Sequence, residues 1–156
     1  MYTYQSNGED ETALLAETLA AKAGAGAVIA LDGDLGAGKT RFSQSFAHAL
    51  GVRGIVNSPT FTIIKEYEGE RFPFYHMDVY RISMSEADEL GLDDYFYGDG
   101  VTLVEWADII RELLPPECLS IRINGTAEEP RTFELTPSGE PYVAWCRELK
   151  ENGILL

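Results

Sequence analysis

Apolar residues along the chain alternate between helical spacing and short, almost wholly apolar runs. Apolar positions that recur every three to four residues are typical of an amphipathic helix, and a short continuous apolar run is typical of a buried strand. The pattern predicts helices over 9–23 and 39–50, and buried strands over 27–31 and 100–106. Alternating helices and buried strands favour an α/β fold built on parallel strands.

The first predicted helix also has a start signal. Ser6 followed three residues later by Glu9 fits a capping box, in which each side chain bonds the other residue's backbone N–H. We therefore expect a helix from about Glu9 to Ala23, ending before Gly24.

The remainder of the chain adds strands and a closing helix. Two strand-like runs flank the turn-like "EGER" and predict a hairpin, and two later runs flank the polar loop "NGTAEEPR". The later pair makes the sheet mixed, although it stays mainly parallel. The segments are strands over 60–67, 72–81, 119–123 and 132–136, a short helix and loop over 85–96, and a closing helix over 140–153.

Residues 33–40, "GDLGAGKT", match the phosphate-binding motif G-x-x-x-x-G-K-[ST], with a predicted strand before them and a predicted helix after them. Such glycines let the backbone N–H groups converge on a phosphate at a helix N-terminus, where the dipole favours anions. Lys39 should face solvent in the empty loop and reach the β- and γ-phosphates, and the Thr40 hydroxyl should bind Mg²⁺. The motif predicts a three-layer α/β/α fold of the P-loop NTPase type.

Two carboxylates are candidates to serve the metal. Ligands collect at the carboxyl ends of strands in open α/β sheets. Glu105 ends the apolar run "VTLVE", and Asp78 lies within "FYHMDVYR". We assign Glu105 to Mg²⁺ and Asp78 to the attacking water or to the residues around the metal, while either one could be an ordinary strand-end charge.

Between the P-loop helix and the next strand lies "NSPTFT", at 57–62. Pro59 could orient Thr60 toward the γ-phosphate as a switch residue, and a plain Asn-Ser-Pro turn explains the segment equally well. His76 is interpreted as a packed strand histidine rather than a base.

Length, cysteine content and charge indicate how many domains the protein has, where it is located and whether it binds nucleic acid directly. A chain of 156 residues with 45% hydrophobic content predicts one domain over 1–156. Neither an export signal nor a membrane span is recognisable, and Cys118 and Cys146 are too few to staple the fold, so we expect a cytoplasmic protein. A formal net charge of −14 disfavours direct binding to nucleic acid.

Three activities fit a phosphate cradle. A guanine-specific GTPase normally displays Asn-Lys-x-Asp, which does not occur here, so ATP is preferred. A small-molecule kinase usually has an arginine-rich lid, and the arginines here are scattered, which makes kinase the alternative. The third possibility is a nucleotide-gated module that acts on a partner.

The motifs "GDLGAGKT", "SPTFT", "HMDVYR", "DELGLDDYF" and "LVEWAD", in this order, resemble the TsaE (YjeE) family. This family is the ATPase subunit of the bacterial machinery that makes threonylcarbamoyladenosine in tRNA. The resemblance extends from the first helix to about residue 125, and the last strands and closing helix carry no signature.

The resemblance implies slow, partner-dependent hydrolysis of ATP, with Mg²⁺ held at Thr40 and Glu105 and with Thr60 as the switch residue. The partner would be a TsaB–TsaD heterodimer that modifies adenosine 37 of tRNA, so tRNA would be met only indirectly. Glu9 would lie near the nucleoside as well as start a helix, and Trp106 would lie near the nucleotide or the partner, if not in the core. The catalytic candidates are Lys39, Thr60, Asp78 and Glu105, and the residues expected to bind nucleotide are Glu9, Gly33, Asp34, Leu35, Gly36, Ala37, Gly38, Lys39, Thr40 and Arg41.

Overall fold

The computed structural model describes residues 1–34, 36–57, 59, 63–125 and 130–156. Within these residues, helices and strands alternate along most of the chain, as the hydrophobic pattern predicts. The elements are β1 (Tyr2–Ser6), α1 (Glu9–Lys22), β2 (Val28–Gly33), α2 (Lys39–Ala49), β3 (Ile64–Glu68), β4 (Pro73–Asp78), α3 (Met84–Asp88), α4 (Asp93–Phe96), β5 (Val101–Glu105), the 3₁₀ helix η1 (Ala107–Leu113), β6 (Cys118–Asn124), β7 (Arg131–Ser138) and α5 (Tyr142–Glu151).

The described strands form one seven-stranded sheet in the order β1-β7-β6-β2-β5-β4-β3. The four central strands, β6, β2, β5 and β4, run parallel to one another. The outer strands β3, β7 and β1 pair antiparallel with their neighbours. The sheet is therefore mixed with a parallel centre, and the predicted hairpin is confirmed as β3 and β4.

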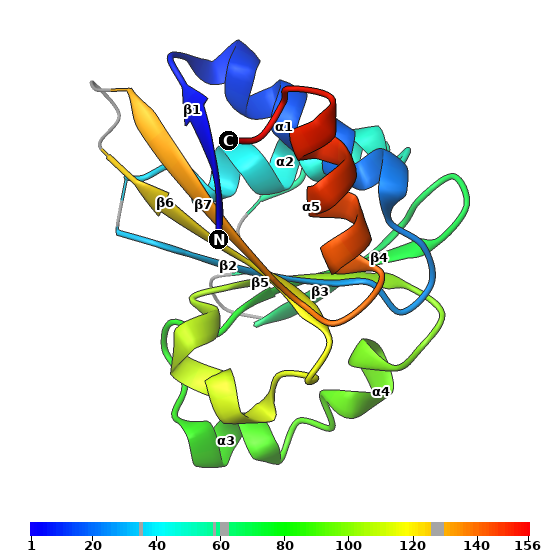
Figure 1. Ribbon diagram of the computed structural model, residues 1–156. Coiled ribbons are helices and arrows are strands. Elements are labelled where there is room, and N and C mark those ends of the chain that lie inside the picture. Colours follow the sequence, from blue (N-terminus) through cyan, green and yellow to red (C-terminus); the bar gives the residue numbers. More distant parts are fainter. Residues whose placement is uncertain (35, 58, 60–62, 126–129) are drawn as a thin grey trace.

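Helices cover both faces of the sheet, which makes the three layers expected from the sequence (Figure 1). One face carries α1, α2 and α5, and the other carries α3, α4 and η1. Successive residues of β2 alternate between the two cores, with Ile29 and Leu31 packed under the first group of helices and Val28 and Ala30 under the second. Residues 28–31 of β2 are apolar because the strand is buried on both faces, and the buried Asp32 follows them near its carboxyl end.

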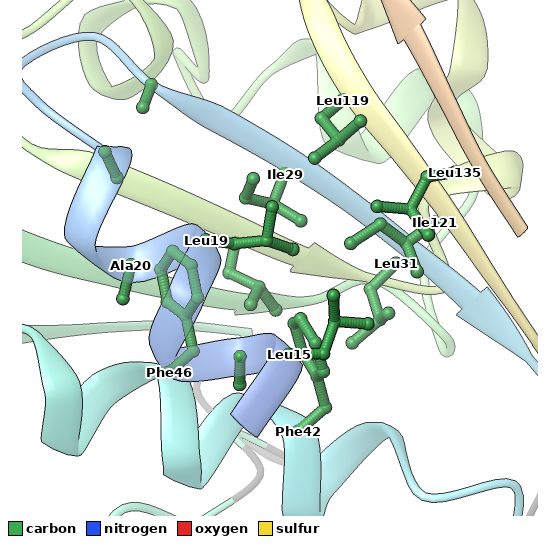
Figure 2. Close-up of a cluster of buried hydrophobic side chains, with 14 of the residues drawn as sticks. Leu15, Leu19, Ala20, Ile29, Leu31, Phe42, Phe46, Leu119, Ile121 and Leu135 are labelled. Atoms are coloured by element: carbon green, nitrogen blue, oxygen red, sulfur yellow. The ribbon is translucent and has the colours of Figure 1, made fainter. Parts of the chain in front are cut away.

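The larger core lies between the sheet and helices α1 and α2. Figure 2 shows Leu15 and Leu19 of α1, with Phe42 of α2, directed toward the side chains of the central strands. All three side chains are fully buried. Apolar residues four positions apart, such as Leu15 and Leu19, lie on one side of the helix, and this side packs on the sheet.

Two features at the start of the chain differ from the sequence analysis. Residues 2–6 form an edge strand, β1, paired with β7. The capping box of Ser6 and Glu9 is wrong: Gly8 precedes the helix, and no side chain caps it. Because Ser6 belongs to β1, its hydroxyl is buried and bonds Thr12 Oγ1 at 2.7 Å instead.

Candidate nucleotide-binding site

The glycine loop connects the carboxyl end of β2 to the first turn of α2, where the motif places a phosphate. Gly36 and Gly38 have φ values of +80° and +106°, which side-chain-bearing residues rarely adopt. A Cβ at Gly38 would also collide with the guanidinium of Arg131. The backbone conformation is the reason that position 38 favours glycine, because the guanidinium is the end of a flexible side chain and could move aside.

Lys39 does not face solvent, contrary to the expectation from sequence. Its side chain is buried, and its ammonium donates to the backbone oxygens of Gly33, at 2.5 Å, and Asp34, at 2.9 Å. The same nitrogen lies 4.1 Å from the centroid of the Trp106 ring. The ammonium folds back because carbonyl oxygens and an aromatic face are the nearest groups that can stabilise a positive charge.

The environment of Lys39 also affects its protonation. Burial lowers the pKa of the ammonium below its ordinary value, and the nearby carboxylates of Glu105, Asp32, Asp34 and Asp78 oppose that change. An added anion such as a phosphate would favour the charged form further.

A cavity of about 370 Å³ opens beside the loop. Its walls come from the P-loop, from the ends of β4 and β5 and from the segments that follow them. The lining residues are Gly36, Gly38, Lys39, Thr40, Ile63, Asp78, Tyr80, Arg81, Glu105 and Trp106.

The two candidate carboxylates lie side by side at the carboxyl ends of parallel strands. Asp78 ends β4 and Glu105 ends β5, and the two residues are paired in the register of the sheet. Glu105 is buried, with its Oε2 2.5 Å from His76 Nε2 and 3.2 Å from Ser43 Oγ. Asp78 is partly exposed and accepts a bond from the backbone N–H of Tyr80 at 3.0 Å. The sheet thus brings both carboxylates to the cavity that holds Lys39.

Comparison with known proteins identifies the family. A sequence model described as "Threonylcarbamoyl adenosine biosynthesis protein TsaE" matches residues 6–133. The chain belongs to the TsaE family. It is 51% identical to the tRNA threonylcarbamoyladenosine biosynthesis protein TsaE of Bacillus subtilis over 143 residues, which are 92% of this chain and 90% of that protein. The protein of the same name from Nostoc sp. is 38% identical over 128 residues, or 80% of this chain and 76% of that protein.

The likeness to TsaE extends to three dimensions. The fold matches the crystal structure of Bacillus subtilis YdiB with a TM-score of 0.82 and 45% sequence identity, covering 98% of each chain. The three-layer P-loop fold expected from sequence is therefore confirmed, including the last strands and helix, which carry no sequence signature. Across the residues that the structure describes, no helix is both long and apolar enough to cross a membrane.

Some residues expected at a TsaE nucleotide site lie outside the cavity. Glu9 and Arg41 are exposed and form an ion pair of 2.7 Å that joins α1 to α2. Gly33 and Ala37 are buried members of the loop, and Asp34 is exposed. The other two predictions, Leu35 and Thr60, lie outside the described residues.

The structure adds residues that sequence reasoning missed. Tyr80 and Arg81 line the cavity just beyond the end of β4, and Ile63 lines it from the start of the hairpin. A position directly after a parallel strand is where ligand-binding residues collect, and "HMDVYR" carried that signal. Trp106, which the family resemblance had already brought into consideration, lines the cavity and packs against Tyr80 with ring centroids 4.6 Å apart.

The oxygen groups of the cavity fit a magnesium ion that arrives with a nucleotide. No cluster of three or more His, Cys, Asp or Glu side chains able to hold a metal occurs in the described part of the chain. Thr40, Asp78 and Glu105 nevertheless direct a hydroxyl and two carboxylates to one cavity. Mg²⁺ commonly uses one or two protein oxygens, phosphate oxygens and water, so this set suits it.

Proposed function

We propose that the protein binds ATP with Mg²⁺ in the P-loop cavity and hydrolyses it slowly. The observation that carries the proposal is the meeting of Lys39 and Thr40 with the strand-end carboxylates Asp78 and Glu105 in one cavity. Phosphoryl transfer depends mainly on positioning and on neutralising charge, and these groups supply both.

Each side chain has a distinct role in this proposal. Lys39 leaves its carbonyl partners and takes the β- and γ-phosphates, which give the ammonium an anionic partner. Thr40, exposed at the start of α2, and Glu105, at the end of β5, hold Mg²⁺, with Glu105 acting directly or through water. Asp78 orients the attacking water. When bound, the metal neutralises charge on the β- and γ-phosphates.

Two further roles rest on the family resemblance. Thr60 senses the γ-phosphate as a switch residue. The nucleoside end of ATP lies toward the Glu9–Arg41 pair, and the loop backbone from Gly33 to Gly38, including Leu35, surrounds the phosphates. The exposed position of this ion pair next to the start of α2 supports that orientation.

We further propose that ATP turnover drives or resets a TsaB–TsaD complex that forms threonylcarbamoyladenosine at position 37 of tRNA. The relatives' names place those proteins in threonylcarbamoyladenosine biosynthesis. A net charge of −14 supports indirect contact with tRNA, because the protein's own field repels a phosphate backbone. The free, buried Cys118 and Cys146 support a reducing cytoplasmic setting.

The test follows labelled phosphate. The protein is incubated with γ-labelled ATP and Mg²⁺, alone and with TsaB–TsaD, and free phosphate is measured over time. We expect slow release alone and faster release with the partner. Label in a small-molecule product would instead favour the kinase alternative, and a rate unchanged by TsaB–TsaD would contradict the partner role.

A further inference from the structure

Three elements meet at the carboxylate of Glu105 beneath the cavity. His76 comes from β4, Ser43 from α2 and Glu105 from the end of β5, and all three side chains are buried. Both neighbours contact the same oxygen, Oε2, at 2.5 Å for His76 Nε2 and 3.2 Å for Ser43 Oγ.

The two contacts differ in strength. A hydroxyl has a single proton to donate, and Ser43 Oγ lies closer to the backbone oxygen of Lys39, at 2.9 Å, than to Glu105. Ser43 can therefore release Glu105 without leaving its proton unsatisfied. His76 holds the shorter contact, so it fixes the carboxylate more firmly.

The tautomer of His76 follows from its partner. A carboxylate oxygen accepts hydrogen bonds, so the proton of this contact lies on His76 Nε2. The other ring nitrogen, Nδ1, is buried and has no hydrogen-bond partner among the described residues. The ring also stacks on Phe74, with centroids 5.8 Å apart.

A buried, unpartnered ring nitrogen costs free energy that an apolar side chain at this position would avoid. Packing against Phe74 therefore does not explain why a histidine stands here. The contact with Glu105 does, because carboxylates that serve a metal are commonly oriented by a further hydrogen bond.

We propose that His76 is a positioning residue that holds the Glu105 carboxylate in the orientation needed for Mg²⁺–ATP. The inference rests on the proposed role of Glu105. Without the Nε2 donor, Glu105 can rotate within the site, and the nucleotide should lose most of the affinity that Mg²⁺ adds. Loss of an orienting partner of this kind commonly lowers metal affinity by about 10- to 100-fold.

Two substitutions separate the donor from the packing. In His76→Gln the amide nitrogen takes the place of Nε2, whereas in His76→Asn the shorter amide stops near the position of Nδ1. Calorimetry with a non-hydrolysable ATP analogue, with and without Mg²⁺, measures the affinity gained from the metal. We expect His76→Gln to retain this gain in affinity. In His76→Asn the gain should be smaller by about tenfold or more. Without Mg²⁺, both variants should bind the analogue as tightly as the wild type does.

The control for packing is Phe74→Leu, which disturbs the ring stacking but leaves the donor, and which should keep the full gain. A full gain in His76→Asn, or equal losses in the Gln and Asn variants, would overturn the inference about His76 but leave the metal assignment of Glu105 standing. A wild-type protein that gains nothing from Mg²⁺ would overturn the metal assignment and this inference with it.

A second test uses the wild-type protein and therefore does not depend on whether a substituted protein folds. Nitrogen-detected NMR of the histidine rings should show His76 with its proton on Nε2, and that signal should shift when Mg²⁺ joins the bound analogue. The Nδ1–H tautomer, or a signal unmoved by Mg²⁺, would overturn the inference.

Discussion

The ammonium of Lys39 lies 4.1 Å from the centroid of the Trp106 ring, and both residues belong to the wall of the P-loop cavity. Trp106 directly follows Glu105 and has φ +63° and ψ +37°, an uncommon conformation for a bulky residue. Strained residues of this kind concentrate at functional sites. The geometry makes Trp106 the natural reporter of where Lys39 lies.

Nucleotide binding should change the fluorescence of Trp106. In the proposed binding mode the ammonium leaves the ring to take the phosphates, and a charge near an indole affects the emission of that indole. We expect a saturable change with ATP in the tryptophan emission of Trp145→Phe, in which Trp106 is the one tryptophan left of the two in the sequence. Trp106→Phe is the matched control, because Trp145 packs against Tyr142 in α5 and should respond little. A response confined to Trp145 would contradict the movement of Lys39.

Lys39→Met should weaken nucleotide binding without harming the fold. Loss of the ammonium should weaken ATP by about 30-fold or more, or ~2 kcal/mol, as measured by calorimetry. The melting temperature should hold or rise, because burying the charge is costly in the free protein. Lys150→Met, at an exposed position in α5, should leave ATP affinity unchanged. Unchanged affinity in Lys39→Met would refute the site.

The stability of the wild type should depend on pH through Lys39. Burial lowers the pKa of this ammonium from its ordinary 10.5, so the folded protein loses the proton before the unfolded chain does. Between the lowered pKa and 10.5 the unfolded state binds more protons, and the free energy of unfolding rises with pH. Urea unfolding from neutral pH to about 10 should show this rise relative to Lys39→Met. A flat or falling difference would contradict it.

Glu105→Gln should separate binding from hydrolysis. The amide keeps the volume of the carboxylate but removes its charge, so turnover with Mg²⁺ should fall by about 100-fold. ATP affinity without Mg²⁺ should change little, because Lys39 and the loop backbone remain. Asp78→Asn, at the paired position of β4, is the comparison. If Glu105→Gln keeps its turnover and Asp78→Asn loses it, Asp78 carries the metal.

Gly38→Ala should destabilise the protein more than Gly36→Ala does. Both glycines have positive φ, so each substitution adds backbone strain of about 1–3 kcal/mol. At Gly38 the new methyl also displaces the guanidinium of Arg131, whereas at Gly36 nothing lies within 4 Å, so we expect a small additional loss at Gly38. Urea unfolding should rank the two variants, and Arg131→Ala should recover part of the loss at Gly38. Equal losses would mean that the close approach does not matter.

Much of the fold could be predicted because its signals are local. The glycine spacing of 33–40, the apolar runs of β2 and β5 and the helical stripes of α1 and α2 each lie within one short segment. Hydrophobic periodicity and turn chemistry act over such distances. The capping box was wrong because a distant contact overrode a local signal. Ser6 belongs to β1, which pairs with β7, a strand more than 100 residues away in the sequence.

The glycine loop, the α/β layers and the candidate carboxylates can be predicted from sequence, since local backbone preferences and side-chain types set them. The pairing of Asp78 with Glu105, the contact of His76 with Glu105 and the position of the Lys39 ammonium over the Trp106 ring emerge only in the folded protein. These relationships depend on which strands become neighbours and on which groups surround a charged side chain once it is buried. Both are set when the whole core packs.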